Sequence, residues 1–463
     1  MKIQNLSSLI HYVQWLYRPL FIFIVTTLSL FTSLVAQSQC DTLPDQSAYL
    51  RSILDAQKVA SIPAGETWRV DQLELKDDES LFGLGTICKA SSSEYALKVT
   101  GNNVQIKDLT FAPQTVSGQP NCDIHLAEGS QHVKIESNHF VGQTYSAVCA
   151  AVDSAVGGQP YFIPASNIII QSNTFDGYVR PLFLHSVSNI TISNNIISRT
   201  LRDAIRLREN NGYVIISNNQ FIDIGNGVNV TDTQDAIDSF WSGQKLVISD
   251  NIVKTTEGVG FDIKGVDPDN IQIGSRSVII ANNLISETRF SAIVLHGDLD
   301  TDAGNYSVIL DANIIEDSVR SASYADAAIW AKGSIKHLTI SNNQLRSNLA
   351  RGITVQTRSG ESDGSVSDVH INGNIVINNG VGSAPSSIGI YLQGVQGAIV
   401  TGNTAGNDPT LSNATTRFGI YATKLTDGIV KNNLLTCNSN TQISITGTNL
   451  IVSDNLQTNA SCP

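Results

Sequence analysis

A short pattern of alternating apolar and polar residues, closed by an asparagine, recurs along most of this chain. Examples are "NITISNN" ending at Asn195, "YVIISNN" ending at Asn219 and "SVILDAN", which closes at Asn313. Alternation with a period of two predicts a β-strand with one buried face. The closing asparagines are Asn138, Asn173, Asn195, Asn219, Asn251, Asn283, Asn313, Asn343, Asn374, Asn403, Asn433 and Asn455. Their spacing of 22 to 35 residues is typical of a solenoid.

A second short strand is expected in each repeat, because a small residue followed by alternating apolar residues also recurs. It reads "AIRLR" from Ala204, "GFDIK" from Gly260 and "AIVLH" from Ala292. Asparagines at equivalent turns can stack into a hydrogen-bonded ladder. A helical solenoid would need a period of 3.6 over ten or more residues, and a β-sandwich would not keep one asparagine register. The sequence therefore predicts an all-β, single-stranded, right-handed parallel β-helix solenoid of about 11–13 coils.

The N-terminal part of the chain differs from these repeats. Residues 1–38 contain an apolar run from Leu20 to Ala36 that follows Lys2 and Arg18, and "AQS" ends at Ser38. This pattern predicts an export signal, with an uncleaved membrane anchor as the alternative. Residues 39–463 would form one β-helix domain, in which a helix over 46–58 caps the open end of the stack. We expect a secreted protein, or else one that is periplasmic or anchored facing outward.

Six cysteines are consistent with an exported chain that forms disulfides. We expect Cys122 to pair with Cys149 and Cys437 with Cys462, which leaves Cys40 for Cys88. There is no CxxC motif, so a zinc site is not expected.

Composition and charge exclude one class of partner. The 463 residues are 41% hydrophobic and 15% charged, with a net charge of -12. Nucleic acid is not an expected partner, because phosphate contacts need a basic surface. An anionic sugar polymer would need a local cationic patch or a bound metal ion. We expect a monomer.

The alternation of the second strands predicts which residues face outward. Ile205 and Leu207 point inward, so Arg206 and Arg208 point outward. The same register gives two columns of outward residues, one residue per coil. The first column reads Phe183, Arg206, Asp238, Asp262, Val294, Trp330, Thr354, Tyr391 and Tyr421. The second reads His185, Arg208, Phe240, Lys264, His296, Lys332, Gln356, Gln393 and Thr423.

Charge gathers in four adjacent coils of these columns. Each Arg–Asp neighbour pair could be an ordinary ion pair worth about 0–1 kcal/mol. As a group the residues suggest more, because Asp238 and Asp262, stacked about 5 Å apart, would repel unless a cation or a proton lies between them. Ca²⁺ takes several such oxygens, and Asp235 and Asp203 precede these strands. The candidate metal ligands are therefore Asp203, Asp235, Asp238 and Asp262.

The chain resembles the pectate-lyase superfamily from Val59 onward. The opening "VASIPAGETWRVDQLELKDDESLFGLG" is similar to the first turns of those β-helices. One calcium-dependent branch has coils reading D-G-F-x-x-K, D-D-G-x-D and G-N-G-F-K-x-G-G. This chain has "DAIRLR" from Asp203, "QDAID" ending at Asp238, and "GVGFDIKG" from Gly258. Gln234 replaces the first acid of the second motif, and Asp262 stands where the family has its lysine, two residues before Lys264.

The resemblance implies a polysaccharide lyase that acts on a uronic-acid-containing chain by β-elimination. In that family, aspartates hold Ca²⁺ and a lysine removes a proton. Here this implies Asp235 and Asp238 as calcium ligands and Lys264 as the base. Arg206, Arg208 and His296 would bind the carboxylate or assist proton transfer. The substrate-binding candidates beside them are Trp241, Trp330 and Lys332.

Three alternatives remain open, since this fold carries many activities. A glycoside hydrolase of polygalacturonase type would use Asp235, Asp238 and Asp262. A uronate epimerase would begin with the same proton removal and return the proton to the other face. A non-catalytic glycan-binding or adhesin β-helix would explain the asparagine ladder but not the local cluster of charge.

Overall fold

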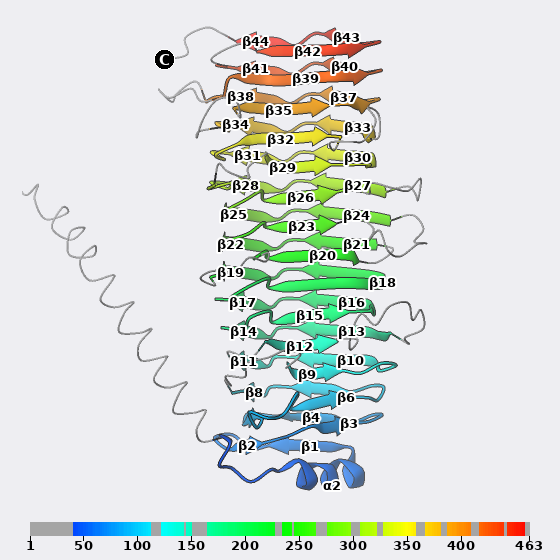
Figure 1. The fold of residues 1–463 in the computed structure, drawn as a ribbon, viewed down its shortest axis with the longest axis vertical. Coiled ribbons are helices and arrows are strands. Elements are labelled where there is room, and N and C mark those ends of the chain that lie inside the picture. The colour runs from blue at the N-terminus through cyan, green and yellow to red at the C-terminus, as the bar shows by residue number, and fades with distance from the viewer. Residues whose placement is uncertain are drawn as a thin grey trace, which may run out of the picture.

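Parallel β-strands stacked in one long column make up nearly all of the computed structural model (Figure 1). The structure describes residues 40–112, 122–142, 145–150, 164–226, 234–242, 245–264, 276–297, 306–321, 327–357, 366–380, 387–408, 416–438 and 442–458. Every pairing between these strands is parallel, as a coil stacked on a coil requires. The expected right-handed parallel β-helix is confirmed.

Each turn contributes strands to three faces, which we call A, B and C in chain order. Face A contains β1 (Val59–Ile62), β4 (Ser80–Gly83), β7 (Gln105–Lys107), β10 (Gln131–Glu136), β13 (Ala165–Gln171), β16 (Val187–Ser193), β18 (Ile205–Ser217), β21 (Lys245–Ser249), β24 (Arg276–Ala281), β27 (Tyr306–Asp311), β30 (Lys336–Ser341), β33 (Val366–Asn372), β36 (Val395–Gln396), β37 (Ile399–Thr401), β40 (Ile429–Lys431) and β43 (Ile451–Ser453). Face B contains β2 (Thr67–Arg69), β5 (Thr86–Cys88), β8 (Thr110–Phe111), β11 (His139–Val141), β14 (Thr174–Asp176), β17 (Ile196–Ser198), β19 (Gln220–Ile224), β22 (Ile252–Thr256), β25 (Leu284–Thr288), β28 (Ile314–Glu316), β31 (Gln344–Arg346), β34 (Ile375–Ile377), β38 (Thr404–Gly406), β41 (Leu434–Thr436) and β44 (Leu456–Thr458). Face C contains β3 (Leu73–Leu75), β6 (Leu97–Val99), β9 (Cys122–Leu126), β12 (Ser146–Ala150), β15 (Leu182–His185), β18 again, β20 (Ile237–Ser242), β23 (Phe261–Lys264), β26 (Ile293–His296), β29 (Ala327–Lys332), β32 (Arg351–Gln356), β35 (Ile388–Gln393), β39 (Phe418–Thr426) and β42 (Ile443–Thr448). The long strand β18 runs from face C around a corner onto face A, which joins these two faces into one 29-stranded sheet.

The stack is longer than the 11–13 coils expected. Face B has one strand in each turn and is a 15-stranded sheet. The first three turns contain no ladder asparagine, so the repeat of closing asparagines did not reveal them. The sequence did not predict the strands of face B, because most are two or three residues long and bury a single side chain. In β14, for example, only Phe175 is buried. One buried residue gives no period from which to recognise a strand.

The predicted asparagine ladder runs unbroken from Asn138 to Asn455. In each step an asparagine Oδ1 accepts hydrogen bonds from the backbone N–H and the Nδ2 of the asparagine one turn before it. At Asn283 the Nδ2 also donates to the carbonyl of Ile248, at 3.0 Å. The residue before each ladder asparagine has a positive φ, as at Asn282 (φ 57). Asparagine, aspartate and glycine tolerate that conformation, which explains why paired "NN", "DN" and "GN" close the motif.

Removing one rung should destabilise the stack. Asn283→Ala is expected to lower the free energy of unfolding by about 2–4 kcal/mol, because it strips partners from at least two buried polar groups at about 1–3 kcal/mol each. These include the backbone N–H of Asn251 and its Nδ2, each 3.0 Å from Asn283 Oδ1. Urea unfolding measures the change. Gln220→Ala, at an exposed strand position, is the control. Equal effects of the two substitutions would contradict a structural role for the ladder.

The interior is filled by stacked side chains of the same kind in successive turns. Phe111, Phe140 and Phe175 stack nearly parallel, with ring centroids 4.5 and 4.8 Å apart. Elsewhere isoleucine, leucine and valine from all three faces form one continuous buried cluster. Burial of these columns favours a single register, since a slip of one residue would turn every apolar side chain outward.

The expected capping helix is confirmed as α2 (Ser47–Gln57), which lies across the blue end of the stack (Figure 1). It buries Leu50 and Leu54 against the first turn. Arg51 forms an ion pair with Glu79, whose side chain is fully buried. Within the described residues no helix has the length and apolar character needed to cross a membrane. The predicted signal or anchor, residues 1–38, lies outside that part of the chain.

Two of the three predicted disulfides are confirmed. Cys40 pairs with Cys88 and fastens the capping segment to face B, and Cys122 pairs with Cys149 across adjacent turns of face C. Cys437 is also disulfide-bonded. Cys462 lies outside the described residues, so its pairing with Cys437 stays a prediction.

Candidate functional site

Face C brings together the two outward columns that the sequence predicted. The strand register pairs Arg206 with Asp238, and Asp238 with Asp262. It likewise pairs Arg208 with Phe240, Phe240 with Lys264, and Lys264 with His296. The columns continue in the predicted order from Phe183 and His185 to Tyr421 and Thr423. Regular alternation in β18, β20, β23 and β26 therefore places the charged residues on four adjacent turns.

Asp238 lies at the centre of the cluster and is fully buried. Its Oδ2 is 3.3 Å from Arg206 Nε, in the preceding turn. Its Oδ1 accepts a hydrogen bond from Lys264 Nζ, in the following turn. A carboxylate without solvent needs such partners, because an unpaired buried charge costs several kcal/mol.

Lys264 supplies the cation that stacked Asp238 and Asp262 require. Its Nζ contacts Asp238 and lies 2.6 Å from Asp262 Oδ2. Burial opposes the charged form of Lys264, but the carboxylates of Asp262, Asp238 and Asp235 outweigh it and raise the pKa of the ammonium. Lys264 is therefore a stable cation at any ordinary pH.

His296 is held on the other side of Asp262. Its Nε2 lies 2.8 Å from Asp262 Oδ1, and 21% of its side chain is exposed. Burial lowers the pKa of His296 more than Asp262 raises it, and the cations Lys332 and Lys264 also disfavour the imidazolium. Burial alone would raise the pKa of Asp262, but His296 and Lys264 bring it down to about 2. The pair is therefore a neutral imidazole oriented by a carboxylate.

Asp203 and Asp235 occupy the turn just before these strands. Asp203 Oδ1 accepts the backbone N–H of Asp235 at 3.1 Å, and Asp235 Oδ1 accepts the N–H of Val259 at 2.7 Å. Gly258 allows this approach, since a Cβ there would lie 2.4 Å from Asp235 Oδ1. The two carboxylates thus bridge successive turns as the asparagines do at the other corner.

Arg180 is a member of the cluster that sequence reasoning missed. Its Nε donates to Asp203 Oδ2 at 3.0 Å, and the guanidinium also contacts the hydroxyl of Tyr145. Arg206 Nη1 reaches the same Asp203 oxygen at 3.4 Å. The position of Arg180, two residues before Leu182 of β15, matches that of Asp203 before Ile205. The residues two positions before each face-C strand therefore form a third column. Extending the strand register to that column would have identified Arg180.

The charges in this cluster nearly balance without a metal ion. Among the described residues, four carboxylates (Asp203, Asp235, Asp238 and Asp262) contact three permanent cations (Arg180, Arg206 and Lys264) or lie beside them. Burial is the main cause that raises the pKa of Asp235 well above its usual value, and the neighbouring carboxylates add to it. A raised pKa favours the neutral, protonated form of Asp235, and a proton there would neutralise the remaining charge.

These contacts do not fit the expected Ca²⁺ site. Asp235, Asp238 and Asp262 do come together, with carboxylate oxygens within 4.8 Å of one another. Lys264, however, contacts both Asp238 and Asp262, and Arg206 lies against Asp238. A calcium ion needs about six to eight oxygen ligands, and a second cation beside this ammonium and guanidinium would be repelled.

The second column presents cations and aromatic rings outward. Phe240 lies between two cations from the neighbouring turns, with Arg208 4.9 Å and Lys264 4.5 Å from its ring centroid. Lys332 lies 3.5 Å from the ring centroid of Trp330. The first column continues with the stacked rings of Tyr391 and Tyr421. The side chain of Trp241, another predicted contact, lies outside the described part of the chain.

Comparisons with known proteins agree on the fold. The family model of the right-handed β-helix region matches residues 86–301. No curated protein matches the sequence. A mutant tailspike protein of E. coli bacteriophage HK620, in complex with a hexasaccharide, is similar with a TM-score of 0.55 and 12% identity over 88% of this chain and 76% of the tailspike. The A-module of a mannuronan C-5 epimerase from Azotobacter vinelandii has a TM-score of 0.41 and 13% identity over 91% of this chain and 97% of the module. The narrower resemblance to the pectate-lyase superfamily stays a prediction.

Proposed function

We propose that this protein cleaves an acidic polysaccharide by β-elimination beside a uronate residue, on face C and without a metal ion. The observation that carries the proposal is the His296–Asp262 pair, which lies next to Lys264 in a column of outward cations and aromatic rings. Such a pair can accept a proton, and the cations beside it can hold a carboxylate.

The charge of the outward column supports an anionic substrate. The chain as a whole carries a net charge of -12, yet from Arg208 through Lys264 to Lys332 this column contains no acid. Aromatic rings lie beside the cations, at Phe240 and Trp330. Rings of this kind pack on the apolar faces of sugars. A tailspike of similar fold is known in complex with a hexasaccharide, which supports a β-helix as a surface for a sugar chain.

The chemistry requires a base at C5 of the uronate and a positive charge at its carboxylate. With Asp262 Oδ1 2.8 Å from His296 Nε2, the proton of the neutral imidazole would lie on Nε2 and the lone pair on Nδ1. Nδ1 takes the C5 proton, the electron pair forms the C4–C5 double bond, and the C4–O bond breaks. The leaving oxygen takes a proton from solvent. Lys264 and Arg208 stabilise the negative charge that develops on the carboxylate.

Lys264 has a different role here from the one that its resemblance to the family's lysine implied. Its contacts with Asp238 and Asp262 keep it protonated, so it stabilises charge and does not abstract the proton. Arg206 is buried against Asp203 and Asp238, so we assign it to positioning of the cluster.

A glycoside hydrolase is less well supported by the same residues. Hydrolysis uses two carboxyl groups on either side of the scissile bond, roughly 5–9.5 Å apart. Asp235, Asp238 and Asp262 are buried and crowded within 4.8 Å of one another, with no room for a sugar between them. An epimerase would share the proton removal but would leave the chain intact.

Cleavage in oxygen-labelled water distinguishes these reactions. Elimination yields an unsaturated end and incorporates no solvent oxygen, so mass spectrometry should show unlabelled products from polygalacturonate, alginate or another polyuronate. Labelled reducing ends would identify a hydrolase. Solvent deuterium at C5 of uncleaved polymer would identify an epimerase.

The pH dependence of cleavage should follow His296. Because its pKa is lowered, mainly by burial, the imidazole stays neutral below the ordinary value of about 6.5. We expect kcat/KM to be constant from about pH 6.5 to 8 and to fall as the solution is made more acidic than the folded-state pKa of His296. Asp262 and Lys264 keep their charges over this range. A decline that begins above pH 7 would contradict His296 as the base.

A further inference from the structure

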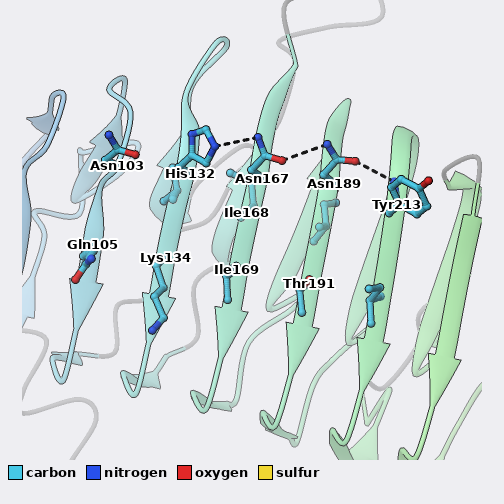
Figure 2. A pocket seen from close by; sticks show the side chains of 13 residues that line it. Asn103, Gln105, His132, Lys134, Asn167, Ile168, Ile169, Asn189, Thr191 and Tyr213 are labelled. Carbon is cyan, nitrogen blue, oxygen red and sulfur yellow. Dashed lines mark hydrogen bonds between the residues drawn. The ribbon is translucent and has the colours of Figure 1, made fainter.

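A groove of about 460 Å³ lies on face A (Figure 2), whereas the charged columns lie on face C. It crosses the outer surface of five adjacent strands: β7, β10, β13, β16 and the last part of β18. Strand β18 therefore contributes Arg206 and Arg208 to the candidate site and Tyr213 and Ile215 to this groove.

Polar side chains form one wall of the groove, joined from turn to turn (Figure 2). Asn167 Nδ2 lies 3.5 Å from His132 Nε2, and Asn189 Nδ2 donates to Asn167 Oδ1 at 3.2 Å. Asn189 Oδ1 accepts the backbone N–H of Tyr213, also at 3.2 Å. Asn167 and Asn189 have positive φ values of 56 and 54, which turn these amides toward the surface. The wall is a row of donors and acceptors at the spacing of the β-helix turns.

Apolar side chains form the floor beside this wall. Ile169 is 37% exposed and Ile215 is 38% exposed, with Thr191 between them in the register. Tyr213 stands at one end with 58% of its surface exposed. The lining contains no carboxylate, and its one lysine, Lys134, is 2.9 Å from Glu136. The groove thus combines exposed aliphatic groups, an aromatic ring and amides, with little net charge.

We infer that this groove is a second binding site, for an uncharged segment of a sugar chain. The faces of a sugar ring are apolar and pack on side chains such as Ile169, Ile215 and Tyr213. Its hydroxyl rim exchanges hydrogen bonds with amides such as Asn167 and Asn189. The groove would hold a polysaccharide on face A while face C performs the chemistry. Binding in the groove does not depend on which reaction occurs on face C.

A second copy of the chain is the less favoured occupant. The aliphatic column does continue beyond the groove, through Val247 and Ile279 to Ile309, which is 38% exposed. The hollow and its amide wall, however, are confined to the turns from Gln105 to Ile215. A flat protein interface would use the whole column equally.

Calorimetric titration with cellohexaose, laminarihexaose and maltohexaose tests the inference. At least one of these neutral probes should bind the whole protein, and Tyr213→Ala and Ile215→Ser should each weaken that binding at least tenfold. Ile309→Ser is the matched control, because it lies in the same column with the same exposure but outside the groove. All three positions are exposed, so the variants should unfold at the wild-type temperature.

Three outcomes would overturn the inference. The first is that none of the neutral probes binds. The second is binding that the groove variants leave unchanged or that Ile309→Ser weakens equally. The third is a wild-type dimer in light scattering that both Ile215→Ser and Ile309→Ser dissociate, which would make the column a protein interface. His296→Ala separates the two sites: it should lower the cleavage rate at least about 100-fold and leave probe binding at the groove unchanged.

Discussion

Replacing His296 with alanine is expected to lower the cleavage rate by a factor of about 100 to 10 000, the usual contribution of a positioned general base. The Nε2 atom of the imidazole lies 2.8 Å from Asp262 Oδ1, which orients the ring. Its lowered pKa keeps it neutral at pH 7. Initial rates of unsaturated product formation on the best polyuronate measure the loss, and kcat should fall much more than KM rises.

The control for this substitution is His337→Ala. His337 is a half-exposed histidine in β30 of face A that lies 3.3 Å from Asp368, so it resembles His296 in having an acidic partner but is not part of face C. This variant should cleave at the wild-type rate. A His296→Ala protein that keeps more than half of the wild-type rate would rule out the assigned base.

Replacing Lys264 with methionine is expected to destabilise the middle of the stack by about 3–5 kcal/mol, the usual cost of removing one partner from a buried ion pair. Lys264 contacts both Asp238 and Asp262, and Asp238 is fully buried. Without the ammonium, two carboxylates in adjacent turns would face each other. Hydrogen exchange of the β20 and β23 amides reports the change locally, because each coil of a solenoid packs mainly on its neighbours.

A double substitution separates loss of charge from loss of packing. Adding Asp238→Asn to Lys264→Met should recover part of the lost protection, since it removes one of the two facing charges. Lys431→Met, at an exposed position of β40, should change nothing measurable. If Lys264→Met were as stable as Lys431→Met, the ammonium would not be what holds Asp238 and Asp262 together.

The two-residue alternation of the strands and the regular repeat of asparagines account for most of the fold that the sequence predicted correctly. Because alternate residues of a strand face outward, the sequence predicted both columns of face C, and the strand register confirms their order. The repeated asparagine gave the ladder, because only a stack of coils brings residues 30 positions apart into contact, as Asn283 and Asn313 are. Like-charge repulsion also required a cation or proton between Asp238 and Asp262.

The identity of that cation could not be predicted, because it depends on side-chain reach and burial. Lys264 is two residues after Asp262 and could have pointed to solvent, but its Nζ folds back onto both carboxylates. The directions of Asp203 and Asp235 depend on a corner whose φ and ψ angles have no sequence period. Arg180 lies in the same corner column as Asp203, two residues before a strand of face C, and continuing the strand register backward would have placed it there.

The most direct test of metal-free elimination on face C is the ultraviolet absorbance of unsaturated uronate during incubation with a panel of polyuronates in the presence of a chelator. We predict that absorbance rises on at least one polymer, at a rate that added Ca²⁺ changes by less than about twofold and that His296→Ala lowers at least about 100-fold. A rise that appears only with Ca²⁺ would show that the Asp235, Asp238 and Asp262 carboxylates bind the ion despite Lys264. No rise on any polymer would contradict the proposed elimination.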